Sequence, residues 1–344
     1  MPAMRISELG GEFALIERVS PKGLRQSKWA RGVLKGIGDD CAILKLDRER
    51  AQVITTDMMV ENDHFSLLWQ TPSDVGFKLG ESSISDIFAM AATPKYAFIS
   101  MSIKSETTVE FIDEFYKGLY QSFTRHGVLL LGGDTTHGTE YVFSLTVIGE
   151  AKIKDIRRRD GAKVGDRICV TGKLGESTAG LKYLLKHKRE GRVAEIVEHK
   201  EQLKRLRKHL RPHCRVLGEA IKIGRFATAM IDVSDGLAPE VKHIAKASAV
   251  GARIFLRSVP LSKTTQEIAK ELEHDAYDYA LYGGEDYELV FTIAEADLAK
   301  LKKLNFKDFK VVGEVVAKKL GVMIRDEMKN EEYAPKKGYD HFGV

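Results

Sequence analysis

The sequence predicts an α/β or α+β protein of two domains. Short segments rich in β-branched or apolar residues, bounded by glycine or aspartate, alternate with segments of helical periodicity along the chain. This interleaving is typical of folds in which helices pack against sheets. The chain has 344 residues, more than one hydrophobic core usually covers, so two domains are expected.

Strands and helices alternate in the first half of the chain. The segment 109–125, VEFIDEFYKGLYQSFTR, places apolar residues at i, i+3, i+4 and i+7, as an amphipathic helix does. Strands are expected at Val53–Thr56, Ala97–Ile103, Val128–Leu131 and Val142–Ile148, and helices at Asp74–Ala92 and Val109–Arg125.

The second half repeats this mixture after a charged, glycine-containing segment, Glu150–Asp166, which lacks apolar periodicity and predicts the domain boundary. We therefore expect domains at residues 1–151 and 152–344. Strands are expected at Arg167–Val170, Ala229–Ile231, Leu289–Thr292 and Val311–Val316, and helices at Ser177–Lys186, Arg215–Ile223 and Pro239–Ala249.

Composition excludes several classes of protein. Hydrophobic residues make up 43% and charged residues 30%, which argues against disorder. The net charge of +5 is too small for this length to demand a nucleic-acid partner. The basic stretch 186–211 carries Leu203, Leu206 and Leu210 at helical spacing, so we interpret it as a solvated helix face.

The cysteines and the lengths of the apolar runs indicate the cellular compartment in which the protein is expected. Cys41, Cys169 and Cys214 form no CxxC pair, which argues against a disulfide framework or a structural zinc site and favours a reducing, cytoplasmic setting. No run approaches the ~20 apolar residues that cross a bilayer, and the N-terminal stretch does not look like a signal peptide. No membrane partner is expected.

Short acidic segments recur along the chain, in most cases after an apolar run. We expect their acids at strand ends, at the edge of a sheet. For any one of them, the alternative is that the acid only caps a helix or closes a turn. The segments are GIGDDCA (36–42), TTD (55–57), SISD (83–86), GGD (132–134), IDVSDG (231–236) and GGEDYEL (283–289).

Together these acids predict a site for hard cations. Gathered carboxylates repel one another, and a fold that collects them usually supplies cations. Oxygen ligands without cysteine or paired histidine suit Mg²⁺, Mn²⁺ or Ca²⁺. Several acids favour more than one Mg²⁺ with a polyphosphate such as ATP. Gly132–Gly133 and Gly283–Gly284 offer backbone amides to phosphate, whereas the Walker A and GxGxxG templates find no match.

These segments, in this order, resemble thiamine-monophosphate kinase, and the resemblance covers nearly the full chain. The blocks that carry it are GEF (11–13), GIGDDCA, TTDMMVENDHF (55–65), SISDIFAMAATP (83–94), GGDTT (132–136), RRDGAKVGD (158–166), VTGKLGESTAG (170–180), HLRP (209–212), IDVSDGL (231–237), GGEDYEL and GYDHF (338–342).

The resemblance implies a two-domain fold like that of aminoimidazole ribonucleotide synthetase, with mixed sheets flanked by helices. It implies a homodimer whose N-terminal domains pair through their sheets and bind ATP near that pairing. The family transfers the γ-phosphoryl group of ATP to thiamine monophosphate with several Mg²⁺ ions, giving thiamine diphosphate and ADP.

Carried over by position, the resemblance also implies residue roles. Catalysis would rest on Asp57, Asp86, Asp134, Asp232 and Arg159. The metal ligands would be Asp40, Thr55, Thr56, Asp57, Asp86, Asp134, Asp232 and Asp235, with Asp39 behind them. ATP would contact Gly133, Asp134, Arg159, Ser234 and Tyr116, and the acceptor would contact His64, Glu285 and Tyr339. From the residues alone, a solvated linker arginine is the preferred interpretation of Arg159, because it lies in the basic run Arg157–Arg159.

Two positions depart from the family pattern. Ser83 stands where the family usually has Asn, and Asp63 stands where it usually has a small or neutral residue. Asp63 and Glu81 would add negative charge near a phosphate-bearing substrate, so either these acids face away, or they hold metal, or the acceptor is a different one. Two alternatives therefore stay open: an ATP-dependent synthetase of the same superfamily that releases phosphate, and a non-catalytic regulator that binds nucleotide or metal.

Overall fold

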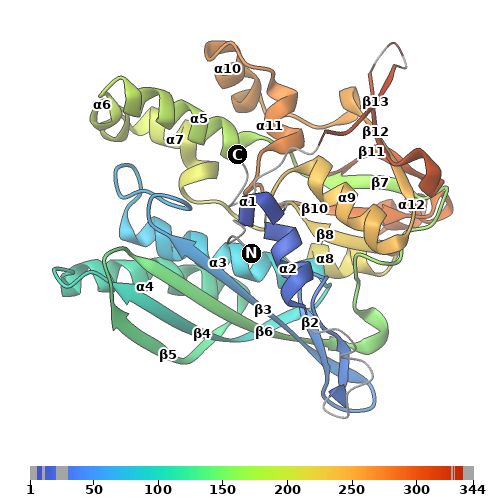
Figure 1. The fold of residues 1–344 in the computed structure, drawn as a ribbon, viewed down its shortest axis with the longest axis horizontal. Helices are drawn as coiled ribbons and strands as arrows, with labels where there is room; N and C mark the ends of the chain where they lie inside the picture. Colours follow the sequence, from blue (N-terminus) through green and yellow to red (C-terminus); the bar gives the residue numbers. More distant parts are fainter. Residues whose placement is uncertain (1–5, 10–11, 21–29, 327, 329, 336–344) are drawn as a thin grey trace.

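The structure is a computed structural model, and it describes residues 6–9, 12–20, 30–326, 328 and 330–335. Two mixed sheets form its framework, one from each half of the chain (Figure 1). Within each sheet most neighbouring strands are antiparallel, but β4–β5 and β9–β12 are parallel. The two-sheet α/β class and the flanking helices expected from the sequence are confirmed.

The first sheet has six strands in the order β1-β2-β3-β6-β4-β5. Its strands are β1 Val33–Lys35, β2 Ala42–Lys45, β3 Arg50–Val60, β4 Thr93–Ile103, β5 Leu129–His137 and β6 Val142–Lys152. Two helices, α3 (Pro72–Ala89) and α4 (Val109–His126), pack against one face and against each other. The opposite face looks toward the viewer in Figure 1.

The second sheet has seven strands in the order β13-β12-β9-β11-β7-β10-β8. Its strands are β7 Arg167–Thr171, β8 Ala227–Asp232, β9 Gly251–Phe255, β10 Leu289–Ile293, β11 Phe309–Val316, β12 Val322–Arg325 and β13 Glu331–Tyr333. Its helices are α5 Glu176–Arg189, α6 Val193–Glu198, α7 Lys200–Leu210, α8 Leu217–Gly224, α9 Leu237–Ser248, α10 Lys263–Glu271, α11 Ala276–Tyr282 and α12 Glu295–Lys303.

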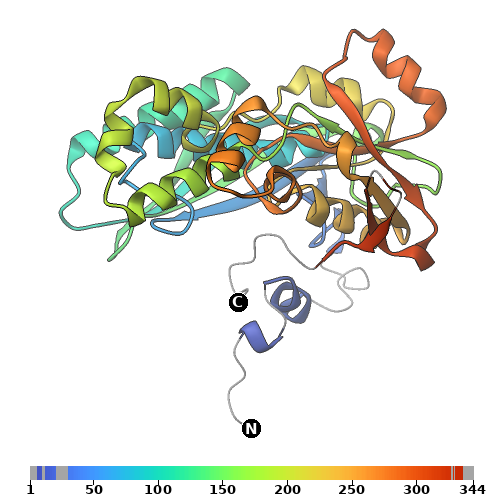
Figure 2. The ribbon, with the colours of Figure 1, turned by 90° about the horizontal axis from the view of Figure 1, so that it is seen from above.

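The N-terminal helices α1 (Ile6–Leu9) and α2 (Glu12–Val19) lie apart from this framework. They lie in front of the junction between the sheets in Figure 1, and Figure 2 shows them displaced from the main body. Among the described helices, none is both long and apolar enough to cross a membrane.

Local sequence explains where the central helices begin and end. Thr71 caps α3 by accepting from the Asp74 amide, while the Asp74 carboxylate accepts from the Thr71 amide, and Pro72 occupies the first turn. Thr108 caps α4 by accepting from the Phe111 amide, and Gly127 ends the helix in the left-handed conformation that glycine favours. The basic stretch is helical, and its Leu206 and Leu210 are buried as expected.

Three of the acidic segments do not lie at strand ends, contrary to our expectation. TTD lies within β3, because β6 pairs with β3 over its whole length. GGD lies within β5, because β4 provides partners from Tyr96 to Ile103. SISD lies in α3, where the Ser83 hydroxyl donates to the Leu79 carbonyl one turn earlier. Asp232, by contrast, ends β8 as expected.

Close contact between α3 and α4 depends on two glycines. A Cβ added at Gly118 would lie 1.8 Å from the Ser73 carbonyl oxygen, and one at Gly76 would lie 2.0 Å from that of Phe115. Both obstacles are backbone atoms, so the helices approach as closely as they do only because these side chains are absent.

We expect Gly118→Ala to lower the free energy of unfolding by about 1–3 kcal/mol, because the added methyl forces the helices apart. Gly218→Ala is the matched control, since Gly218 is exposed in α8 and its Cβ would meet nothing within 4 Å. The control should be neutral or stabilising by up to about 1 kcal/mol. Chemical denaturation measures both, and equal effects would contradict the packing argument.

Candidate active site

A cleft of about 750 Å³ lies between the two halves of the molecule. Its walls come from β3, the segment after β3, and α3 on one side, and from α5, the end of β8 and the GGEDYEL loop on the other. Glu12 of α2 also borders it. The lining includes the predicted site residues Thr56, Asp57, His64, Asp86, Asp232, Ser234, Asp235 and Glu285.

Three carboxylates meet beside this cleft. Asp40 precedes β2, Asp86 lies in α3 and Asp232 ends β8, yet one oxygen of each lies within 4.8 Å of the others. The cluster therefore joins both sheets and the helix between them. The sequence analysis predicted all three as metal ligands, and the fold brings these three together.

Hydroxyl groups orient the acids of this cluster. Thr55 Oγ1 donates to Asp86 Oδ2 at 2.5 Å, and Ser85 Oγ donates to Asp232 Oδ2 at 2.6 Å. Asp57 points to the α3 side of β3, where burial raises its pKa and the nearby Ser83 and Ser82 act in the opposite direction. Ser83, one of the two departures from the family pattern, thus lies near a predicted metal ligand.

Burial and the repulsion of neighbouring carboxylates favour the protonated forms of Asp86 and Asp232. Burial, followed by the charges of Asp57, Asp232 and Asp40, raises the pKa of Asp86 well above its usual range. Burial and the Asp40 carboxylate raise the pKa of Asp232 to about 8. A cation placed among these groups would remove the repulsion and favour their charged forms.

The donors present fit a hard divalent cation. The cluster presents only carboxylate and hydroxyl oxygens, the ligands that Mg²⁺ prefers. Asp40 Oδ2 is buried and has no hydrogen-bond partner among the described residues, so it retains a lone pair for an ion. Its other oxygen accepts from the Arg159 guanidinium at 2.5 Å.

Arg159 is held by the acids at the edge of the cluster. Its amide donates to Asp39 Oδ1 at 3.2 Å, and its side chain pairs with Asp40. Lys35 also lies 3.6 Å from Asp39. Burial and the Asp40 charge together raise the pKa of Asp39 to about 6. Asp39 thus supports Arg159 and Asp40 from behind, and Arg159 is not a solvated linker residue.

A further buried acid, missed in the sequence, supports the IDVSDG loop. Glu240 of α9 is 2% exposed, and its carboxylate accepts from the Asp235 amide at 3.0 Å and the Ser234 hydroxyl at 3.4 Å. The only sequence feature that could have indicated this role is the position of Glu240, an acid in the first turn of the helix that follows the loop. Glu240 fixes the two loop residues that border the cleft.

Lys78, which sequence reasoning also missed, connects the two walls of the cleft. Its side chain is fully buried in α3, donates to the His64 carbonyl at 2.8 Å and pairs with Glu285. His209 Nδ1 lies 3.5 Å from the same carboxylate. Burial opposes ionisation, but Lys78 and His209 prevail and lower the pKa of Glu285 to about 2. A lysine on the buried face of a helix was the available signal.

The remaining predicted residues lie elsewhere. Gly133 and Asp134 are on the exposed edge strand β5, separated from β3 by β6 and β4. Tyr116 is half-buried on α4 between the rings of Phe115 and Tyr120. Within a single chain these residues do not join the carboxylate cluster. Tyr339 lies outside the described residues.

The two extra acids have different positions. Asp63 lines the cleft, with its carboxylate 3.6 Å from His64 Nδ1. Glu81 is buried on the α4 side of α3, where it pairs with His126. Glu81 therefore adds no charge to the cleft, whereas Asp63 does.

Comparison with known proteins defines first the class of protein and then the family. Residues 38–151 match the family model of the AIR synthase related protein N-terminal domain, and residues 163–325 match that of its C-terminal domain. The two matches fall on the two halves of the chain, each of which forms one of the two sheets.

Full-length relatives narrow the class. Thiamine-monophosphate kinase of Escherichia coli K12 is 35% identical, covering 97% of this chain and 99% of the relative, and that of Buchnera aphidicola from Acyrthosiphon pisum is 34% identical, covering 96% and 99%. The solved structure of AaThiL complexed with AMPPCP and TMP has a TM-score of 0.83 and 30% identity, covering 99% of this chain and 100% of that one. The chain belongs to the thiamine-monophosphate kinase family.

The raised pKa of Asp232 predicts a pH-dependent response to Mg²⁺. The folded pKa of about 8 exceeds the ordinary 3.8, so the metal-free fold holds this proton more tightly than the unfolded chain does. This proton therefore stabilises the metal-free fold fully below the ordinary pKa of 3.8, and the stabilisation is lost as the pH rises through the folded pKa of about 8. We expect the Tm in EDTA to fall across this window, and Mg²⁺ to raise it most at the alkaline end.

Thermal unfolding over a pH series, with and without Mg²⁺, tests this expectation. Asp232→Asn removes the titrating group and should flatten the dependence in EDTA. A wild-type Tm that is equally sensitive to Mg²⁺ at both ends of the range would contradict it.

Lys78→Met should destabilise the fold by about 2–3 kcal/mol, because Glu285 loses its main counter-ion. The value lies below the 3–5 kcal/mol typical of a broken buried pair, since Glu285 keeps some contact with water. Lys117→Met is the control, as Lys117 pairs with Glu114 on the surface of α4, where pairs contribute under about 1 kcal/mol. Adding Glu285→Gln to Lys78→Met should recover part of the loss in urea denaturation, and no recovery would argue against the pairing.

Proposed function

We propose that this chain transfers the γ-phosphoryl group of ATP to thiamine monophosphate, giving ADP and thiamine diphosphate. The observation that carries the proposal is the cluster of Asp40, Asp86 and Asp232 beside a cleft of about 750 Å³. Full-length relatives bear the name of this kinase, and the related AaThiL structure holds AMPPCP and TMP.

The chemistry asks for positioning and charge neutralisation. The acceptor phosphate is mostly ionised at neutral pH, so its oxygen can attack the γ-phosphorus without a strong base while the bond to ADP breaks. Two anionic groups must approach each other, and this is the main barrier. A site made of carboxylates, hydroxyls and one guanidinium suits this task better than it suits acid–base catalysis.

Mg²⁺ fits the acid cluster, and when bound it would neutralise phosphate charge. We assign Asp40, Thr55, Asp57, Asp86, Asp232 and Asp235 as the groups that hold it within one protomer. Arg159 would bind phosphate oxygens through its fork of N–H donors, and Ser234 would contact ATP at the mouth of the cleft.

On the acceptor side we assign His64 and Glu285, which Lys78 holds in a fixed relation across the cleft. A carboxylate ionised down to pH of about 2 suits recognition of the positively charged thiazolium ring better than proton transfer. We expect Tyr339 to contribute an aromatic face to the same acceptor.

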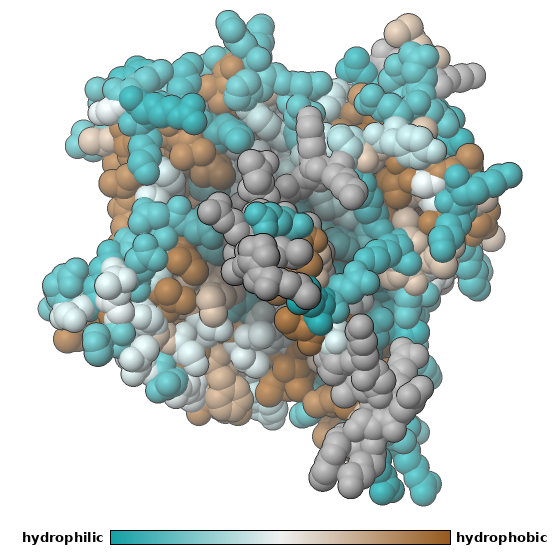
Figure 3. Space-filling view, viewed as in Figure 1, coloured by the Kyte–Doolittle hydropathy of each residue, from teal (hydrophilic) through white to brown (hydrophobic). Residues whose placement is uncertain are grey.

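We also propose that two copies pair through the exposed face of the first sheet. Met58, Tyr96, Phe98 and Leu129 lie on this face with 37–62% of their surface exposed. Figure 3 shows apolar side chains among polar ones in this region. Strand alternation and register place the side chains of Thr56 and Asp134 on the same face. Pairing would therefore bring these two predicted metal ligands, together with Gly133, to the interface between the two copies.

This assignment gives each half of the chain a role. We propose that residues 1–151 bind nucleotide and metal and form the dimer, and that residues 152–344 complete the cleft. The strands support a boundary in this region, since the first sheet ends at Lys152 and β7 begins at Arg167. We place the protein in the cytoplasm, in line with its three free cysteines.

Product analysis by mass tests the activity directly. Incubation with ATP, Mg²⁺ and thiamine monophosphate should give ADP and thiamine diphosphate in equal amounts. Phosphate release without thiamine diphosphate would favour a synthetase of the same class, and absence of turnover with retained ATP binding would favour a regulator.

Asp57→Asn and Asp86→Asn should each lower kcat at least ~100-fold with the fold retained, because each removes one of the carboxylates that we assign to Mg²⁺. Asp113→Asn is the control, since Asp113 is an exposed acid on α4. Steady-state kinetics and circular dichroism measure the two effects. Unchanged turnover in both active-site variants would reject their role with metal.

A further inference from the structure

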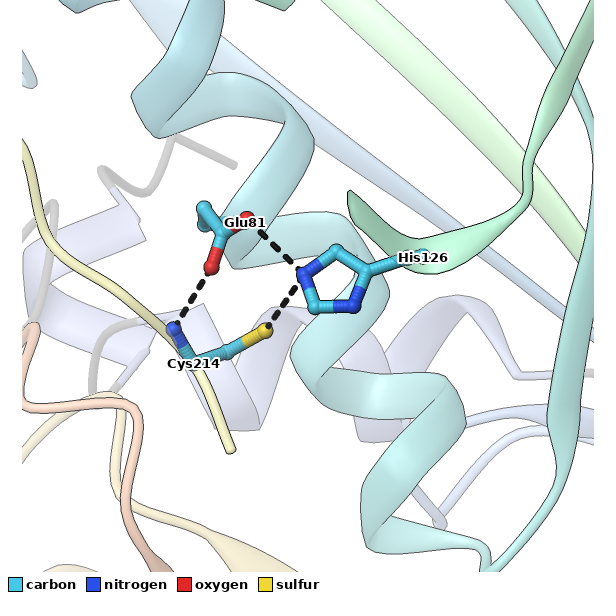
Figure 4. Close-up of side chains that lie close together, drawn as sticks. All are labelled: Glu81, His126 and Cys214. Carbon is cyan, nitrogen blue, oxygen red and sulfur yellow. Dashed lines mark hydrogen bonds and ion pairs between the residues drawn. The ribbon is translucent and has the colours of Figure 1, made fainter. Parts of the chain in front are cut away.

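A second group of metal-ligating side chains lies away from the cleft. Glu81 of α3, His126 at the end of α4 and Cys214 of the segment between α7 and α8 point toward one another (Figure 4). One ligand atom of each lies within 4.8 Å of the others. Glu81 and Cys214 are 0% and 3% exposed, and the His126 side chain is 2% exposed.

The geometry argues against a nucleophilic relay. In a relay, the acid and the thiol contact opposite nitrogens of the imidazole. Here both meet the same nitrogen: His126 Nε2 lies 2.8 Å from Glu81 Oε1 and 3.7 Å from Cys214 Sγ. Burial and the Glu81 charge also raise the pKa of the Cys214 thiol well above its usual range. The three ligand atoms instead surround a common point.

We propose that Glu81, His126 and Cys214 bind a divalent metal of borderline softness, with Zn²⁺ as the best match. Thiolate, imidazole and carboxylate are the ligands of protein zinc sites, and three of them leave the fourth tetrahedral position for water. The set differs from the all-oxygen cluster at the cleft, which selects a harder ion. A thiolate and a carboxylate balance the charge of Zn²⁺, so the buried site would be neutral.

Neighbouring groups already hold the ligands in place. Glu81 Oε1 accepts from the Ser122 hydroxyl at 3.0 Å, and Glu81 Oε2 accepts from the Cys214 amide at 2.9 Å. The Phe88 ring packs edge-on against the His126 ring. Such supporting contacts orient ligands before an ion arrives. On binding, Cys214 would release its thiol proton to solvent, and the His126 proton would move from Nε2, where it faces Glu81, to Nδ1 by exchange with solvent, so that the Nε2 lone pair can bind the metal.

The site would tie three separate pieces of chain together. Glu81 and His126 belong to the helices that cover the first sheet, whereas Cys214 follows α7 of the second half. A metal at this point would link the two halves on the α4 side of α3, outside the lining of the cleft. The predicted effect is stabilisation of the fold, not participation in phosphoryl transfer.

Cobalt titration of the full-length protein tests the site, because Co²⁺ occupies zinc sites and a thiolate–cobalt bond absorbs in the near ultraviolet. Excess Mg²⁺ is present to occupy the acid cluster. We expect a charge-transfer band that saturates at a single cobalt ion per chain and is displaced by Zn²⁺. Cys214→Ser and His126→Gln should weaken cobalt binding at least ~10-fold, as loss of a ligand does.

Cys169→Ser is the matched control, since Cys169 is also fully buried but lies in β7 of the second sheet. It should leave the band and the binding unchanged. Thermal unfolding adds a second measurement: Zn²⁺ should raise the Tm of the wild type and of Cys169→Ser, but not that of His126→Gln. His126→Gln keeps the thiol, so it serves if Cys214→Ser fails to fold.

Two results would overturn the proposal. One is the absence of a thiolate–cobalt band in the wild-type protein. The other is a band, or a Tm response to Zn²⁺, that persists in His126→Gln and in folded Cys214→Ser. In either case the three side chains would form a metal-free hydrogen-bonded cluster.

Discussion

The repulsion among Asp40, Asp86 and Asp232 is the interaction on which the rest of the site depends. Carboxylates within 4.8 Å of one another in a buried setting are unstable as anions unless a cation or protons offset them. Arg159 reaches only Asp40, and hydroxyls of Thr55 and Ser85 stabilise the other two only in part. Each of the three comes from a different element, so the two sheets and α3 must be in place before the repulsion exists. The fold thus creates an affinity for divalent cations as it forms.

Helix α3 provides many of the polar groups that organise the site. It is packed between the first sheet and the second half of the molecule, and most of its residues are buried, including polar ones. Different faces of the helix serve different partners: Lys78 and Asp86 face the cleft region, Ser83 faces Asp57, and Glu81 faces α4. A helix buried on all sides normally requires apolar residues throughout. Here each polar group is instead matched by a specific partner.

The sequence allowed the class of fold, most elements and the acid cluster to be predicted, because periodicity and local motif are properties of short segments. Asp40, Asp86 and Asp232 could be grouped by the shared chemistry of their segments. The position of TTD and GGD within strands could not be predicted, because glycine and aspartate normally end strands. Here the strands continue through these segments because β6 and β4 provide hydrogen-bonding partners. Lys78 with Glu285, and Glu81 with His126 and Cys214, are joined by tertiary contact between positions far apart in the chain, which no local pattern records.

The contact of Lys78 with both His64 and Glu285 has a consequence for how ligands enter. One buried ammonium group connects the two walls of the cleft, so the distance between those walls is set during folding. The conformational entropy of these walls is therefore lost during folding, so ligand association requires little further ordering. A ligand on this side of the cleft would thus enter a preformed, rigid slot, without closure of the two halves around it. Selectivity would then rest on the shape of the slot, so that an acceptor of the wrong width is rejected on entry.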